Sequence, residues 1–284
     1  MFNSRHPIVC APMNGVSDLK LAIACAQAGI VPSLIPYNYK DFNQFFVDLS
    51  TYKNITHSDI IIALRLDELV DNRLHNKLMR SGITHIELLE FTESDLTDNN
   101  INKIQSIRNS GIKIILKVLT HNDILAYKNT IDAVTIKSNE SAGRSEEGID
   151  LISEIKTIES LHPDIKIIAS GGVKNKTDLR LLLNEGATAV GIGTLFAMSK
   201  ESSIPIHVKT KLLQKSSEDI TRLKNGAQQR AVIFEEKLSD DFNNTNGLNT
   251  GLQTGTSGHI FVGNAIDTIT DILSVQDIVN HLTV

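Results

Sequence analysis

Short apolar segments rich in Ile, Val and Leu recur along the chain between residues 7 and 192, separated by longer amphipathic segments. They lack the period-two alternation of a half-exposed strand, which indicates strands buried on both faces, as in a parallel sheet. Strands are expected at residues 7–12, 32–35, 59–66, 84–91, 112–119, 133–137, 166–169 and 187–192.

Apolar residues at helical spacing fill most of the intervals between these strands. Helices are expected at residues 17–28, 39–49, 68–81, 96–110, 121–128, 148–160 and 177–185. A succession of strand–helix units predicts an α/β fold of the (β/α)₈ TIM barrel type, with a doubly wound sheet as the structural alternative.

The pattern changes after the last expected strand. Residues 201–236 are polar and predict helix, whereas residues 238–258 are rich in Asn, Thr and Gly and predict a loop or a mobile segment. The closing segment is apolar at first and then helical over residues 275–282. We therefore expect a barrel from residues 1–200 with 265–284, and a small helical and loop cap over its mouth from residues 201–264. A separate folding unit is disfavoured, because the inserted part has too few apolar residues for its own core.

Composition narrows the class of protein. The chain has 284 residues, 41% hydrophobic and 21% charged, with a net charge of -5 and no run of Lys or Arg, which argues against nucleic-acid binding. Its apolar runs are far shorter than the ~18–20 residues of a membrane span, and residues 1–6 do not resemble a signal peptide. Cys10 and Cys25 are expected to be free thiols, as in a cytoplasmic protein, and no metal site is predicted.

Two glycine turns stand one strand–helix–strand unit apart. The first follows the strand at 166–169 as Ser170-Gly171-Gly172, and the second follows the strand at 187–192 as Gly193-Thr194. Either turn alone is common between a strand and a helix. As a pair, they match the phosphate site that β/α-barrels build after their last two strands, so a phosphate group is expected there.

Charged residues are expected at the same mouth, because they follow other strands of the barrel. These charged residues could form a purely structural ion network, and this interpretation is about as well supported as a catalytic role for one of them. The residues concerned are Arg65, Glu90, Lys117, His121, Lys137, Ser138, Asn139 and Glu140, beside the turn Ala11-Pro12-Met13-Asn14-Gly15.

Several of these segments resemble the nitronate monooxygenase (2-nitropropane dioxygenase-like) flavoproteins and the related flavin-dependent enoyl-acyl-carrier-protein reductases. Residues 7–17, PIVCAPMNGVS, are similar to their opening PIxxAPMxGxS, and residues 132–144, DAVTIKSNESAGR, align with DxxxxQGxEAGGH. The likeness is strongest in IASGGV and VGIGTLFAMSKES, and weaker echoes lie at residues 226–230 and 262–265.

The resemblance implies one FMN, with its phosphate on the two glycine turns and its ring beside the turn at residues 13–15. It also implies that the last residue of the EAGGH segment, a histidine in the family, is the catalytic base. The cofactor-binding residues expected on these grounds are Ala11, Pro12, Met13, Asn14, Gly15, Arg65, Lys117, Lys137, Gly143, Ser170, Gly171, Gly172, Gly193 and Thr194.

This chain departs from the family pattern at the catalytic position, where Arg144 replaces the histidine. An arginine stays protonated and cannot act as a general base, although it can hold an anionic substrate such as a nitronate. Lys137 and Ser138 replace the usual Gln and Gly, and Arg65 loosely aligns with an Asn. The family's acidic residue is kept as Glu140. His121 or, in the cap segment, His259 is the candidate for any base that is still needed.

Three functions remain open. The favoured one is an FMN-dependent oxidoreductase of the nitronate monooxygenase type acting on a small anionic substrate, with Arg144, Glu140 and His121 as catalytic candidates. The second is an FMN-dependent reductase that passes hydride from NAD(P)H to an enoyl thioester. The third is a barrel that binds phosphate or flavin without redox activity. A homodimer is compatible with each.

Overall fold

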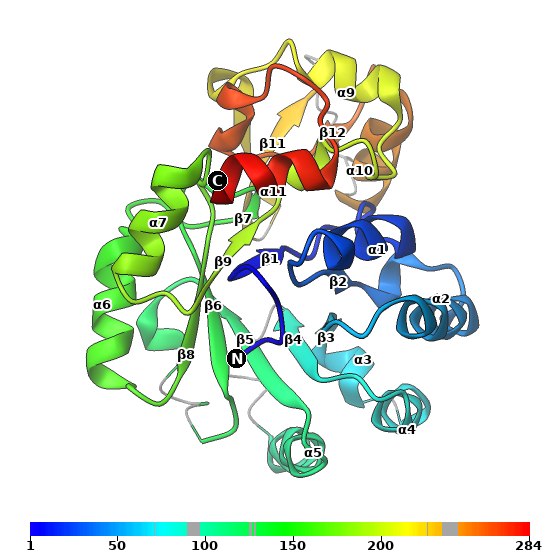
Figure 1. Ribbon diagram of the computed structural model, residues 1–284, viewed down its shortest axis with the longest axis vertical. Coiled ribbons are helices and arrows are strands. Elements are labelled where there is room, and N and C mark those ends of the chain that lie inside the picture. The colour runs from blue at the N-terminus through cyan, green and yellow to red at the C-terminus, as the bar shows by residue number, and fades with distance from the viewer. Residues whose placement is uncertain (71, 90–96, 125–126, 128, 226, 235–243) are drawn as a thin grey trace.

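The computed structural model describes residues 1–284 except 71, 90–96, 125–126, 128, 226 and 235–243. Its main feature is an eight-stranded parallel sheet in the order β1-β9-β8-β6-β5-β4-β3-β2 (Figure 1). A parallel bridge between Val9 and Val31, just before β2, joins the two edge strands. The strands are β1 (Ile8–Cys10), β2 (Ser33–Leu34), β3 (Ile61–Arg65), β4 (His85–Leu89), β5 (Lys113–Val118), β6 (Ala133–Lys137), β8 (Lys166–Ser170) and β9 (Ala189–Ile192).

The expected TIM barrel is thus confirmed, and each of the expected strands overlaps one of these eight. The doubly wound alternative is wrong, because an open sheet would lack the bridge between β1 and the β2 edge. Cys10 and Cys25 are free and buried, as expected. In the described part of the chain, no helix has the length and apolar character needed to cross a membrane.

Helices cover the outside of the barrel (Figure 1). The segment expected as one helix at 68–81 is divided between α3 and α4, and the helix expected at 121–128 is a short 3-10 turn at its described start. The helices are α1 (Leu19–Gln27), α2 (Phe42–Ile55), α3 (Leu66–Val70), α4 (Asn72–Arg80), α5 (Asp98–Asn109), α6 (Leu151–Leu161), α7 (Lys176–Asn184), α8 (Thr194–Ala197) and α11 (Val275–Thr283), with the 3-10 turn η3 (His121–Ile124).

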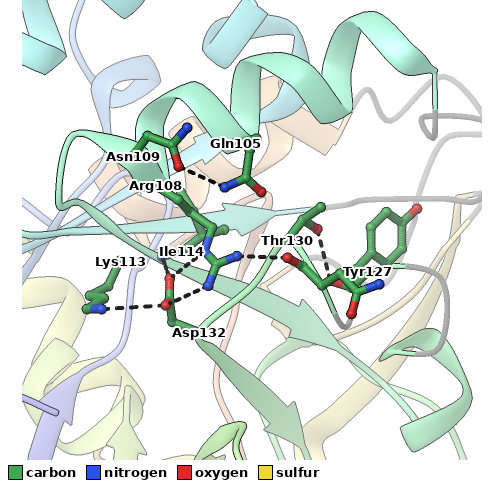
Figure 2. A network of polar contacts seen from close by, with 9 residues as sticks. Gln105, Arg108, Asn109, Lys113, Ile114, Tyr127, Thr130 and Asp132 are labelled. Atoms are coloured by element: carbon green, nitrogen blue, oxygen red, sulfur yellow. Dashed lines mark hydrogen bonds and ion pairs between the residues drawn. The ribbon is translucent and has the colours of Figure 1, made fainter.

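A partly buried ion network ties α5 to β5 and to the residue before β6 (Figure 2). Arg108 donates from Nε and Nη2 to the two carboxylate oxygens of Asp132, at 3.2 and 3.1 Å, and from Nη1 to the carbonyl of Asn129. The backbone N–H of Ile114 donates to the same carboxylate, and Lys113 lies 3.6 Å from it. Burial raises the pKa of Asp132, but these donors outweigh it and bring the pKa below its usual value.

A second sheet contradicts the expectation that residues 201–236 are helical. Among the described residues of this segment, only α9 (Ile206–Leu212) and a 3-10 turn, η4 (Ser217–Asp219), are helical. They are followed by an antiparallel hairpin of β10 (Ile220–Asn225) and β11 (Ala227–Ile233). β11 also pairs with β12 (His259–Ile260) and with β7 (Gly143–Arg144), so this sheet joins the chain beyond the barrel to the loop after β6.

The expectation of a loop over residues 238–258 is also wrong where the structure describes it, because α10 spans Asn244–Thr254. Its glycines allow close contact with β12. A Cβ on Gly251 would lie 2.2 Å from the carbonyl oxygen of His259, and one on Gly258 would lie 2.2 Å from the carbonyl of Gly247. The glycine-rich composition that suggested a loop therefore allows the backbone of α10 to lie directly against the backbone of β12.

The barrel interior is apolar at its base and polar toward the strand ends. The base is filled by one apolar cluster, and the alternate strand positions face the helices instead. Higher in the interior, Glu87 of β4 is 1% exposed, and Lys137 of β6 is 8% exposed. The basal cluster is Val9, Val31, Ile61, Ile115, Ala133, Ile168 and Ala189, with Phe2 packed against it.

Candidate active site

A cavity of about 690 Å³ lies at the carboxyl ends of the barrel strands. Residues that end or follow β1, β5, β6, β8 and β9 form its floor and sides, while residues of β11, β12 and α10 also line it. Chemistry in a β/α-barrel takes place at this end. The volume lies in the range of cofactor and small-molecule sites.

The first glycine turn lines the cavity in a conformation that only glycine adopts readily. Gly171 and Gly172 have φ angles of 105° and 75°. A Cβ on Gly171 would lie 2.5 Å from the Ser138 hydroxyl oxygen, and one on Gly172 would lie 2.4 Å from Oε2 of Glu140. Both backbone strain and lack of space therefore require glycine here.

The second glycine turn also lines the cavity, together with Ser170 of the first. Thr194 is buried, and its hydroxyl accepts a hydrogen bond of 3.0 Å from the backbone N–H of Gly263. Its hydroxyl proton remains available for another acceptor. Gly193 has a φ of -106°, which other residues also adopt, so its role is to leave space. The two turns thus bring backbone N–H groups and one hydroxyl to a single wall.

The turn after β1 is fixed by hydrogen bonds to Asn38. The side-chain amide oxygen of Asn38 accepts a hydrogen bond from the N–H of Gly15, and the amide nitrogen of Asn38 donates one to the carbonyl of Met13. Met13 and Asn14 line the cavity with Ala11 and Pro12. Gly15 has another environment: a Cβ there would lie 2.4 Å from Cδ1 of Leu252 in α10, so the missing side chain makes room for that leucine.

Three cationic side chains line the same cavity: Lys117, Lys137 and Arg144. Lys137 is buried, and its Nζ donates a 2.7 Å hydrogen bond to the carbonyl of Ala142. Burial and then the charge of Lys117 hold the pKa of Lys137 well below its usual value, Glu87 opposes this, and Arg144 and Arg230 add to it.

The loop that carries Arg144 is held by the second sheet. Arg144 pairs with Gln229 across the β7–β11 ladder, and Gly143 pairs with Arg230. The Arg230 guanidinium donates to the carbonyl of Asn139 at 2.8 Å and to the side chain of Asn264. Asn264 in turn donates from its backbone N–H to the carbonyl of Glu140. Glu140, Gly143 and Arg144, all of which line the cavity, are positioned by these contacts.

Five residues expected at the mouth lie outside the cavity lining in the described part of the chain: Gly15, Arg65, His121, Ser138 and Asn139. The Arg65 guanidinium carbon lies 5.6 Å from the ring centroid of Tyr37, which does line the cavity. His121 is bound to Glu154 of α6, with Nδ1 3.0 Å from the carboxylate and the backbone N–H at 2.6 Å.

His259, the second candidate base, and Glu90, a charged residue expected at the mouth, complete the comparison. His259 is fully buried against Phe261, with ring centroids 5.1 Å apart, and burial lowers its pKa. Its neighbours Ile260 and Phe261 line the cavity. Glu90 lies outside the described residues.

Part of the lining is not among the expected site residues. These residues come from the turn after β2, from the segment around η3, from the residues after β7 and from the second sheet. The weak family echo at residues 226–230 and the apolar run at 259–262 are the signals that could have indicated Gln229 and Phe261. The unexpected lining residues include Tyr37, Asn122, Asp123, Glu146, Gln229 and Phe261.

Residues 52–284 match the sequence profile of a family described as nitronate monooxygenase. The chain belongs to the nitronate monooxygenase family. This is the family that the resemblance in its motifs predicted.

Individual relatives are distant. One is a (3aS,4S,5R,7aS)-5-hydroxy-7a-methyl-1-oxo-octahydro-1H-indene-4-carboxyl-CoA dehydrogenase of Rhodococcus jostii (strain RHA1), 22% identical over 219 residues, which are 76% of this chain and 59% of that protein. The chain thus spans less than two thirds of that relative's length.

Two solved structures share the fold. FabK from Thermotoga maritima has a TM-score of 0.84 at 21% identity, over 98% of this chain and 92% of FabK. Nitroalkane oxidase from Streptomyces ansochromogenes has a TM-score of 0.79 at 18% identity, over 98% of this chain and 95% of the oxidase.

Proposed function

We propose that this chain is an FMN-dependent oxidoreductase that oxidises a nitronate, or a similar small anionic carbon acid, with oxygen. The observation that carries the proposal is a single cavity that combines two glycine turns with the cationic side chains of Arg144 and Lys117. The turns suit a phosphate, and the cations suit an anionic substrate. Membership in the nitronate monooxygenase family supports the same reaction class.

The residues present fit FMN. Its phosphate would be held by the N–H groups of Gly171, Gly172 and Gly193 and by the hydroxyl of Thr194, on the wall where a Cβ at either positive-φ glycine would collide. The ring would lie beside Met13 and Asn14. Bound FMN would supply a two-electron acceptor that oxygen can reoxidise. We propose Lys117 as a cation beside the ring, because it lies near the carboxyl end of β5 and lines the cavity.

Arg144 is proposed to orient the substrate. Its guanidinium stays charged at any working pH and offers a planar fork of N–H donors, which matches the two oxygens of a nitronate or a carboxylate. The β7–β11 pairing fixes its backbone, so the side chain does not depend on a free loop for its position. Phe261 and Leu252 line the same cavity and would exclude water from the substrate.

Glu140 is proposed to position the phosphate turn, because its carboxylate fills the space that a Gly172 side chain would need. No role is proposed for His121, whose ring is bound to Glu154 and lies outside the cavity lining.

Oxygen uptake tests this function. The purified protein, saturated with FMN, is expected to consume oxygen on addition of a small nitronate such as propyl-2-nitronate. The same preparation should oxidise NADPH slowly, whether or not an enoyl thioester is present. No oxygen uptake with any nitronate would contradict the proposal.

A second candidate is a reductase that passes hydride from NAD(P)H to an enoyl thioester. The relative whose name includes a carboxyl-CoA thioester favours it. NADPH oxidation that depends on an enoyl thioester, without oxygen uptake from nitronates, would select this function instead.

A further inference from the structure

The replacement of the family histidine by Arg144 leaves the site without its expected base, and the structure offers another group in the same cavity. Lys137 lies at the end of β6, buried to 8% exposure, and it lines the cavity with Arg144. Its Nζ donates a hydrogen bond of 2.7 Å to the carbonyl of Ala142. A neutral amine in that position uses one N–H for this bond and keeps its lone pair for a proton.

The charges around Lys137 favour the neutral amine. Lys117 faces it from β5, Arg144 from β7 and Arg230 from β11, and each lowers its pKa in addition to burial. On the neighbouring strand β8 its partner is Ser170, which has no charge. Glu87 of β4 is the acidic group that acts in the opposite direction. The hydrogen-bond acceptor of Lys137 Nζ is the backbone carbonyl of Ala142, which carries no charge.

We propose that Lys137 is the general base that removes a proton from the substrate carbon, so that this chain also accepts neutral carbon acids such as nitroalkanes. The inference rests on the proposed function. In this step the substrate C–H bond breaks and a new N–H bond forms on Nζ, which becomes an ammonium group. The electron pair stays on the substrate as the nitronate, whose oxygens pair with Arg144. Oxidation then follows as for an added nitronate, and Lys137 returns its proton to solvent.

Kinetics with a matched pair of substrates tests the role. For wild type and Lys137→Gln, kcat/KM is measured with 2-nitropropane and with its nitronate prepared in advance. The ratio of the two values is expected to fall by about 100-fold or more in the variant, because only the neutral substrate needs the base. In wild type, activity on 2-nitropropane should rise with pH as Lys137 loses its proton. Lys166→Gln, an exposed lysine at the opposite end of the barrel, is the control and should change neither value.

Nuclear magnetic resonance supplies a readout that does not depend on turnover. In the FMN-bound protein labelled with [ε-¹³C]lysine, the signal missing from Lys137→Gln identifies this residue. It should titrate well below the exposed lysines. Titration together with the exposed lysines would overturn the proposal.

The kinetic outcomes separate the two proposals. Equal losses with both substrates would overturn the base role and point to binding or to a contact with the flavin. Wild-type activity on nitronate with none on nitroalkane would overturn the base role and leave the proposed function standing. Activity on neither substrate would overturn both.

Discussion

Gly193 offers the sharpest test of the phosphate site, because it can be changed without strain. Its φ of -106° and ψ of -68° are open to other residues, and a Cβ there would meet nothing nearer than Sδ of Met13, at 3.7 Å. Gly171 and Gly172 do not qualify, since a Cβ at either would collide at 2.5 or 2.4 Å. Gly193→Asp should therefore place a carboxylate in the cavity of a folded barrel.

The size of the effect follows from Coulomb's law. A carboxylate about 5 Å from a phosphate of charge about -1.5, at an effective dielectric constant of about 20, costs about 5 kcal/mol. This is a loss of more than a thousandfold in FMN affinity. Gly193→Ala, which fills the same space without charge, should stay within about tenfold of wild type.

Titration of the apoprotein with FMN, followed by quenching of flavin fluorescence, measures the two affinities. Riboflavin, which lacks the phosphate, is the ligand control and should distinguish the Asp and Ala variants far less. Equal FMN affinity in Gly193→Asp and Gly193→Ala would refute the placement of the phosphate, provided that thermal melts show both variants folded.

Three further predictions concern single residues. Arg144→Gln should raise KM for a nitronate by about 30-fold or more, since a charge-assisted pair contributes about 2 kcal/mol or more; exposed Arg180→Gln, the control, should leave KM unchanged. Asp132→Asn should cost about 1–3 kcal/mol of unfolding free energy at pH 7 in urea denaturation. Because the folded pKa of Asp132 is lowered, that stabilisation is present above its unfolded pKa and is lost as the pH falls through the folded one, so the difference between the two proteins should shrink on acidification. A difference that does not depend on pH would argue against the ion network. Gly251→Ala should destabilise the protein by at least about 1–3 kcal/mol, because its Cβ would meet the His259 carbonyl at 2.2 Å. Asn249→Ala, on the exposed face of α10, is the control. Equal melting temperatures for the two variants would refute the close contact.

The barrel could be predicted from the sequence because its signals are local. Each strand is a continuous apolar run, and the turns at Gly171–Gly172 and Gly193 interrupt those runs at the spacing of one strand–helix–strand unit. The register of a parallel barrel then places these turns at one end, so a cavity at the carboxyl ends of the strands follows from the topology.

The second sheet could not be predicted in the same way. Ile220, Leu223, Ala227 and Ala231 fit helical spacing, although the Asn-Gly dipeptide at 225–226 is typical of a two-residue hairpin. The partner strands β7 and β12 are only two residues long, and they come from distant parts of the chain. Neither strand is long enough to show a detectable alternation of apolar and polar residues in the sequence.

Side-chain partners account for the remaining differences at the site. His121 follows β5 and Arg65 ends β3, both at the correct end of the barrel, but His121 is bound to Glu154 and Arg65 lies over the Tyr37 ring, and neither lines the cavity. A residue's position along a strand sets the end of the barrel that it reaches, whereas these contacts between distant segments set the direction of its side chain. The low pKa of Lys137 likewise arises from its burial in the folded barrel and then from charges on three other strands, which the sequence does not place.

The visible absorption spectrum of the purified protein, followed by anaerobic addition of a nitronate, is the most direct test of the proposed function. We expect an oxidised flavin spectrum, in the protein as isolated or after addition of FMN, that the nitronate bleaches and that air restores. A protein that takes up no FMN, or a bound flavin that NADPH bleaches and no nitronate does, would contradict it.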